Sequence, residues 1–204
     1  MGFIDYAWAV SIQKDNTKVK ILQNSALTQP ILEGDDFGFT ITLPTVKILE
    51  GGNISFLGHK FPATNAGKSK MGRLFRATVM HLTTHTMAPF PKEKIVIKKS
   101  DSFVESFAKS LINDTYNNAY IQAWYPDRFF DFAYANAVAY QKIKSSERIF
   151  TVSTKLMVAL LTKLNVGLIK SSPGIEEEKT VDLLYNNLKA VSYTHLTLPT
   201  NREV

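Results

Sequence analysis

The pattern of apolar residues changes from strand-like to helical after the loop at 61–67, and this change limits the folds that the chain can adopt. Three short segments before it are rich in β-branched and aromatic residues, at 37–43, 45–49 and 54–58. Pro44 and the pair Gly51 and Gly52 separate these segments, as expected for short strands joined by tight turns. We therefore predict a small β-meander in the N-terminal part of the chain.

After residue 61 the apolar residues recur every three or four positions, which is the period of an amphipathic helix. Ser102 and Glu105 have the spacing of a capping box, which marks a helix start. The sequence thus predicts an α+β fold that is mainly α, with a short N-terminal β-meander followed by a five-helix bundle-like region. The expected helices are 68–87, 102–125, 127–145, 147–165 and 174–190, with a single strand at 94–98.

The last fourteen residues, 191–204, resemble the conceptual translation of a sequencing-library adapter. Ten consecutive residues, VSYTHLTLPT, match the adapter in one reading frame. We therefore interpret 191–204 as an artefactual tail and leave it out of the fold argument. The expected division is an N-terminal extended or β segment at 1–60 and a helical domain at 61–190, which the natural protein would continue beyond Ala190.

Composition excludes several classes of protein. With 204 residues, 45% of them hydrophobic, the chain can bury a core, so it is not mainly disordered. The absence of cysteine excludes disulfide scaffolds, iron–sulfur clusters and cysteine nucleophiles, and it favours a cytoplasmic protein. The net charge of +6 is scattered along the chain and does not predict nucleic-acid binding. The sequence also predicts no signal peptide and no membrane span, because the latter needs roughly 20 consecutive apolar residues.

Two histidines on the helix predicted at 68–87 are the first candidates for chemistry. His81 and His85 are four residues apart and lie on or beside its apolar face, so one helix would present both imidazoles to a metal ion. In zincin proteases a glutamate follows the first histidine and acts as the general base. Here that position is Leu82, which cannot accept a proton from water.

The next predicted helix, 102–125, carries two polar residues on its apolar face, Asp114 and Asn118. A buried carboxylate needs a cation or hydrogen-bond donors, and the two histidines upstream are candidates for that role. Two interpretations follow. Either His81, His85 and Asp114 bind one divalent metal such as zinc, or they form a structural polar cluster with Asn118.

A loop before the helix at 68–87 partly matches a phosphate-binding P-loop. The residues PATNAGKS, at 62–69, end in the required Gly-Lys-Ser, but Pro62 stands where the motif needs its first glycine. Proline has no N–H to offer a phosphate. We therefore interpret this segment as a loop that leads into a helix, without a nucleotide site.

The order of several pieces resembles the N-terminal helical region of the NorD-like nitric oxide reductase activation proteins and their CobT cobaltochelatase-subunit relatives. The resemblance covers roughly residues 61 to 128. The pieces that carry it are Arg73 to Ala77, His81, His85, 113–117 and the pair Tyr125 and Pro126. The sequence departs from the family at Thr83 and Thr84, where a small residue and glycine are usual, and it keeps only Asp114 of the acidic motif.

This resemblance implies a non-enzymatic accessory protein of the cytoplasm. Such proteins typically continue into a von Willebrand factor A domain and work with a MoxR-type AAA+ ATPase on a metalloenzyme client. The implied partners are therefore proteins, the AAA+ ATPase and the client. The alternative is a zincin-like metal-dependent hydrolase, or a degenerate derivative, with His81, His85 and Asp114 as zinc ligands and a base that the sequence does not identify.

Overall fold

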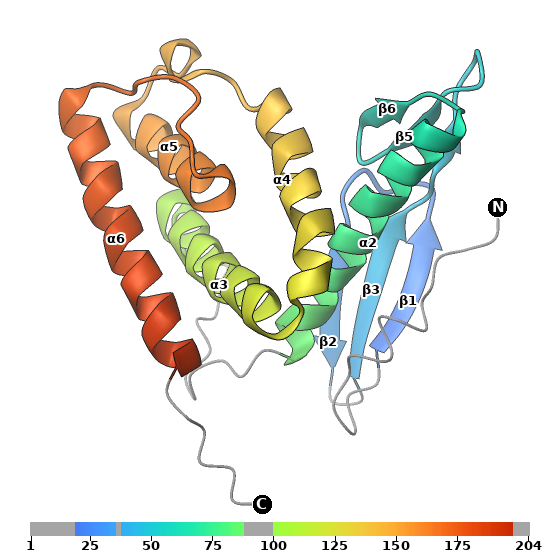
Figure 1. Cartoon of the computed structure of the whole chain (residues 1–204), viewed down its shortest axis with the longest axis horizontal. Helices are drawn as coiled ribbons and strands as arrows, with labels where there is room; N and C mark the ends of the chain where they lie inside the picture. The colour runs from blue at the N-terminus through green and yellow to red at the C-terminus, as the bar shows by residue number, and fades with distance from the viewer. Residues whose placement is uncertain (1–18, 36–37, 88–99, 198–204) are drawn as a thin grey trace, which may run out of the picture. The chain divides into compact units, whose positions relative to one another are not determined.

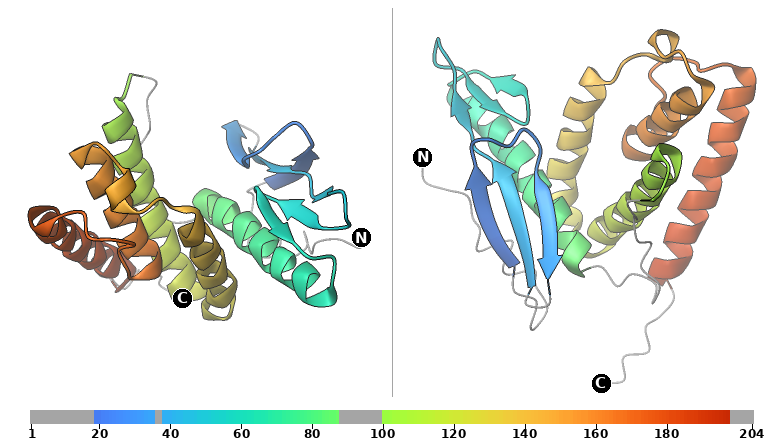
Figure 2. Two further views of the ribbon diagram at one scale, coloured as in Figure 1. Left: turned by 90° about the horizontal axis from the view of Figure 1, so that it is seen from above. Right: turned by 180° about the vertical axis from the view of Figure 1, so that it is seen from behind.

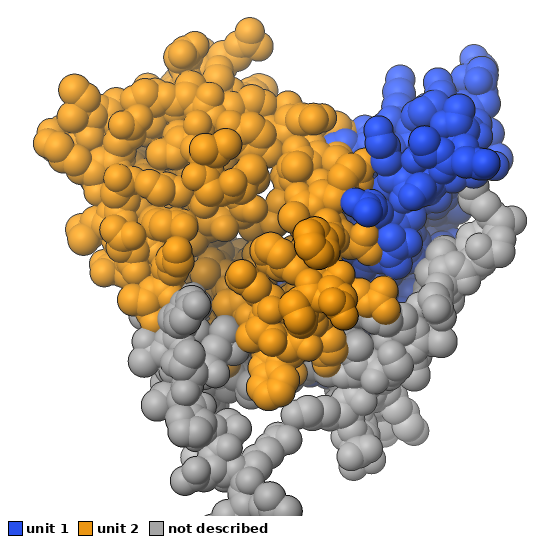
Figure 3. Space-filling model, viewed as in Figure 1, with its two compact units in different colours: residues 1–89 blue, residues 90–204 orange. Residues whose placement is uncertain are grey.

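The computed structural model describes residues 19–35, 38–87 and 100–197. It has the predicted α+β architecture, mainly α, with short strands first and helices after them (Figure 1). The chain divides into two compact units, residues 1–89 and 90–204 (Figure 3). The helix expected at 68–87 belongs to the first unit together with the strands. The strand predicted at 94–98 lies outside the described residues.

In its described residues, the first unit contains two small sheets of three strands each. In one sheet the order is β1-β3-β2, with β1 parallel and β2 antiparallel to β3; in the other, β4, β5 and β6 form an antiparallel meander. Strands β1 and β2 were not predicted, because their sequences lack a regular alternation of apolar residues. The strand bounds are β1 (Val19–Asn24), β2 (Ile31–Asp35), β3 (Gly38–Pro44), β4 (Lys47–Ile48), β5 (Ile54–Phe56) and β6 (His59–Phe61).

Among the described residues of the first unit, the helix α2 (Asn65–Met87) covers the core. It packs against β3, β5 and β6, and Figure 2 shows it lying along the strands of both sheets. On β3, Ile41 and Leu43 alternate with more exposed threonines and are fully buried. The rings of Phe56 on β5 and Phe75 on α2 lie 5.2 Å apart between centroids. Burial of this apolar face, rather than the strands' own pairing, holds the two short sheets in place.

The second unit is helical. Its longer helices are α3 (Phe103–Trp124), α4 (Phe129–Lys142), α5 (Val152–Val166) and α6 (Ile175–Thr197). They confirm the four predicted helices, and α6 continues past residue 190, where the prediction ended. Short 3₁₀ helices, η1 (Pro126–Arg128) and η2 (Ser146–Arg148), precede α4 and α5 and shorten them relative to the prediction. The core is formed by α3, α5 and α6, through Leu111, Ala159, Leu160 and Val181.

The ends of these helices are formed by local hydrogen bonds. At α3 the predicted capping box is present: Ser102 Oγ accepts from the Glu105 amide, and the Glu105 carboxylate accepts from the Ser102 amide at 2.8 Å. At α5 the Thr151 hydroxyl caps the first turn, and Gly167 ends the helix in the left-handed conformation with a φ of 79°. Local sequence therefore fixes where α3 and α5 begin and where α5 ends.

Candidate functional site

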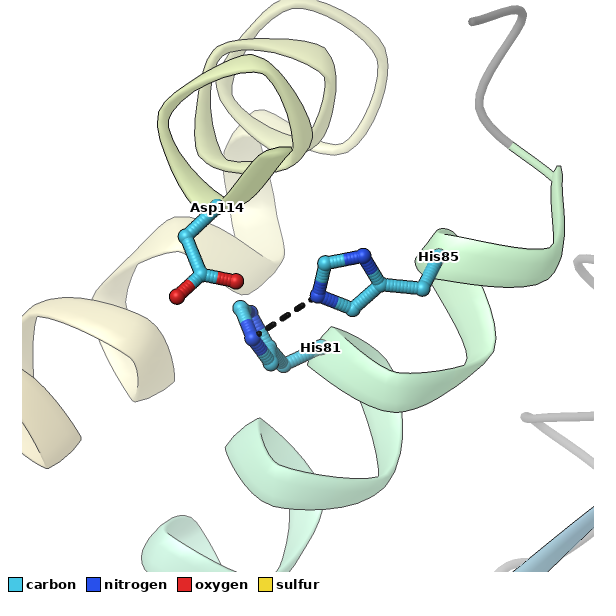
Figure 4. A group of neighbouring side chains, drawn as sticks. All are labelled: His81, His85 and Asp114. Carbon is cyan, nitrogen blue, oxygen red and sulfur yellow. Dashed lines mark hydrogen bonds between the residues drawn. The ribbon is translucent and has the colours of Figure 1, made fainter. Parts of the chain in front are cut away.

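The two predicted metal ligands of α2 lie against each other. The Nε2 atoms of His81 and His85 are 3.1 Å apart, and their rings meet edge to face at 90° with centroids 4.6 Å apart (Figure 4). Both side chains are half-buried. With neutral imidazoles, one Nε2–H donates a hydrogen bond to the other Nε2, so the two rings must hold different tautomers. The helical spacing thus produces the pairing that the sequence predicts.

Two threonines whose burial the sequence did not predict lie between the two histidines of α2. Thr83 and Thr84 are fully buried, with 0% of each residue exposed. The Thr83 hydroxyl donates to the carbonyl of Val79 at 2.8 Å, and the Thr84 hydroxyl donates to the carbonyls of Met80 and His81 at 2.8 and 2.9 Å. Because threonine can bond back to its own helix, these hydroxyls are buried without leaving a donor unpaired. The sequence signal for this burial is the position of the two threonines between His81 and His85.

The position that would carry a general base is apolar. Leu82 follows His81 directly and is half-buried, and the next two positions are the buried threonines. Leucine has no lone pair for a proton, so this turn of α2 offers metal ligands without the base that zincin hydrolysis requires. This turn of α2 therefore places two metal ligands side by side, with an apolar residue at the position of the general base.

The other two predicted site residues lie on α3, in the second unit. Asp114 is partly buried on this helix. Asn118 donates a hydrogen bond from Nδ2 to Asn165 Oδ1 on α5 at 3.1 Å. The amide that one interpretation placed in a cluster with the histidines therefore connects two helices of its own unit.

Asn118 belongs to a chain of amide contacts through three helices. Asn165 donates from Nδ2 to the carbonyl of Leu161 at 3.0 Å, and Asn136 on α4 donates to the carbonyl of Asn165 at 3.2 Å. The neighbouring Asn117 is fully buried. Asparagine occurs mostly at exposed positions, so the residue type alone does not predict this network.

The P-loop-like segment has a structural role at the start of α2. The Thr64 hydroxyl accepts a hydrogen bond from the Gly67 amide at 3.2 Å, and the Thr64 carbonyl accepts from the Lys68 amide at 2.9 Å. Gly67 is buried against the backbone of Pro62, and a Cβ at position 67 would overlap the Pro62 carbonyl oxygen. Glycine is therefore required here by close packing, which agrees with the interpretation of a loop leading into a helix.

Two ionisable groups of α3 have shifted pKa values. Hydrogen bonds from the Ser102 backbone and side chain lower the pKa of the Glu105 carboxyl. Burial raises the pKa of the Tyr116 hydroxyl above its ordinary value of about 10, at which the phenol is already protonated at neutral pH. The first shift belongs to the capping box, and the second marks a partly buried phenol two residues after Asp114.

The second unit exposes large aromatic side chains. Trp124, at the end of α3, is 63% exposed, and its ring lies 6.2 Å from that of the buried Tyr120. Phe130, near the start of α4, is 73% exposed, and Phe150, before α5, is 98% exposed. Among the helices that the structure describes, none has the length and apolar content needed to span a bilayer. Aromatic side chains are enriched in the cores of protein–protein interfaces, and tryptophan is common among the residues that dominate binding energy there.

Comparison with known proteins assigns no function to the histidine pair or to the exposed aromatic residues. No family model matches the chain, and no match was found among curated proteins or solved structures.

Proposed function

We propose that this chain is a non-enzymatic accessory module that binds partner proteins through its helical unit. The observation that carries the proposal is the exposure of Trp124, Phe130 and Phe150. An exposed aromatic ring keeps apolar area in contact with water, and its burial against a partner releases that free energy. The ring of Trp124 also contacts the ring of Tyr120, so Trp124 can bind a partner without first being ordered.

The resemblance to NorD-like and CobT-like proteins supplies the partner class. It implies a MoxR-type AAA+ ATPase and a metalloenzyme client, acting in the cytoplasm. An accessory role is compatible with an α2 helix that lacks a general base beside its histidines, because such a role needs no hydrolytic chemistry. Trp124 and Phe130 flank η1, and we place the contact with the ATPase at this turn between α3 and α4.

The test is co-elution of the purified chain with a MoxR-type AAA+ ATPase from the genome that encodes it, in the presence of ATP. We expect a complex whose affinity falls at least about tenfold in the double variant Trp124→Ala, Phe130→Ala, because exposed aromatic anchors dominate interface energies. Ile48→Ala is the matched control, since Ile48 is an apolar side chain of the first unit that is 78% exposed.

Two results would contradict the proposal. One is the absence of any complex at protein concentrations well above the dissociation constants of transient ATPase complexes. The other is equal loss of binding in the double variant and in Ile48→Ala, because the contact would then not be specific to the aromatic residues of the helical unit.

A second candidate, a zincin-like hydrolase or its degenerate derivative, is favoured by the contact between His81 and His85. Under this alternative the purified protein should contain about one equivalent of zinc, lose it on His85→Ala, and hydrolyse a peptide or amide substrate only when loaded. A folded, zinc-loaded protein without hydrolytic activity would exclude the hydrolase and leave the accessory function in place.

A further inference from the structure

We infer that His81 and His85 form a binding site for a divalent transition metal that does not depend on catalysis. The inference goes beyond the proposed accessory function, because it concerns the first unit and needs no partner protein. It starts from the distance of 3.1 Å between the two Nε2 atoms.

That distance is close to what a shared metal requires. A tetrahedral zinc ion with bonds of about 2.0 to 2.1 Å holds two nitrogen ligands about 3.3 to 3.4 Å apart. The observed separation is a few tenths of an ångström smaller, so small side-chain rotations would open the pair enough to admit the ion. In the metal-free chain the same two nitrogens share a proton instead, and the metal would replace that hydrogen bond.

The helix supports the pair against larger rearrangement. Val79 and Met80, just before His81, are 3% and 1% exposed, and Thr83 and Thr84 are fully buried. The Thr84 hydroxyl also fixes the carbonyl of His81, and the Thr86 hydroxyl donates to the carbonyl of Thr83 at 2.7 Å. Ligands on a rigid, packed helix lose little conformational entropy on binding, which raises metal affinity.

The ligand type selects the metal. Two imidazoles suit zinc, nickel, cobalt and copper, whereas magnesium and calcium prefer oxygen ligands. The histidines are half-buried and not enclosed, so an ion can reach them from solvent. Coordination by two histidines leaves further positions for water or another ligand, and Asp114 is the residue that the sequence predicts for one of them.

The test is isothermal titration of the full chain with Zn²⁺ and with Ni²⁺, in a buffer that does not bind either metal. The chain has four histidines, at 59, 81, 85 and 195, which allows a matched pair of double variants. The variant His59→Asn, His195→Asn keeps the site, and the variant His81→Asn, His85→Asn removes it. Asparagine keeps a polar side chain at each position.

We expect one equivalent of metal to bind to the natural chain and to the variant lacking His59 and His195, with affinities within about threefold. Loss of the groups that orient metal ligands lowers metal affinity roughly 10-fold to 100-fold. Loss of the ligands themselves should lower the affinity at least as much. The variant lacking His81 and His85 should therefore bind at least about tenfold more weakly, and Mg²⁺ should not compete. The single variants His81→Asn and His85→Asn give the same comparison should the double variant not fold, as judged by circular dichroism.

The inference is overturned by either of two results. The first is the absence of saturable binding by the natural chain. The second is unchanged affinity in folded variants without His81 or His85, which would assign the metal to other residues.

Discussion

Asn118 on α3 donates its Nδ2 hydrogen bond to Oδ1 of Asn165 on α5, at 3.1 Å. Asn165 in turn donates to the carbonyl of Leu161 on its own helix. Asn118 Nδ2 and Asn165 Oδ1 are thus hydrogen-bonded to each other within the helical unit, and this contact fixes how α3 and α5 align. Apolar packing through Leu111 and Leu160 brings these helices together, and the asparagines select one register for them.

Replacement of Asn165 with alanine should therefore destabilise the helical unit. The change removes the acceptor of Asn118 and leaves a partly buried amide without that partner. We expect the free energy of unfolding to fall by about 1 to 3 kcal/mol, measured by urea denaturation. Asn187→Ala is the control, because Asn187 is exposed on α6 and its loss should change stability by no more than about 0.5 kcal/mol. Equal effects of the two substitutions would show that the amide network contributes nothing.

Two glycines of α2 should respond in opposite directions to the same substitution. At Gly67 an added methyl group would overlap the Pro62 carbonyl oxygen, so Gly67→Ala must displace the loop or the first turn of the helix. At Gly72 the nearest atom is the flexible Arg76 Nη1 at 3.5 Å, so alanine fits. We expect Gly72→Ala to raise stability by about 0.5 to 1 kcal/mol, because alanine is the better helix former.

Thermal and chemical denaturation of both glycine variants measure this difference. Gly67→Ala should lower the midpoint, whereas Gly72→Ala should raise it. A neutral Gly67→Ala variant would mean that this close approach between loop and helix is absent, and that the glycine of the P-loop-like segment needs another explanation.

The helices could be predicted from the sequence because their signals are local. A period of three to four residues, the capping box of Ser102 and Glu105, and Pro126 after α3 each act within one or two turns. Strands β3 and β5 were found for the same reason, as short runs of β-branched and aromatic residues. By contrast, β1 becomes a strand through its parallel pairing with β3, a contact between distant residues that no local signal predicts.

The candidate site was only partly predictable, for a similar reason. The contact between His81 and His85 follows from helix geometry alone, so their spacing was sufficient. The burial of Thr83 and Thr84 was missed because their hydroxyls are satisfied by the helix's own carbonyls, which makes a polar residue behave as an apolar one.

The stability of α3 should change with pH because of its capping box. The pKa of Glu105 is below its ordinary value because the Ser102 backbone and side chain donate to its carboxylate. A carboxyl group with a lowered folded-state pKa stabilises the fold above its unfolded pKa, and this stabilisation is lost as the pH falls through the folded value. Ser102→Ala should return the pKa of Glu105 toward the ordinary value of about 4.3, as measured by carbon NMR titration of the carboxyl group. An unchanged titration would show that the serine side chain does not contribute to the shift.

The substitution Asp114→Asn separates the two interpretations that the sequence left open for this residue. If Asp114 is a metal ligand, removing its charge should weaken Zn²⁺ binding about tenfold or more, while stability without metal changes little. If it is a structural partner, the free energy of unfolding should fall by about 1 to 3 kcal/mol in the metal-free chain, and zinc affinity should stay as in the natural protein. Zinc titration and urea denaturation of the same preparation measure both quantities. Asp182→Asn is the control, because Asp182 is an exposed residue of α6 whose carboxylate pairs with Lys163, and its loss should leave zinc affinity unchanged.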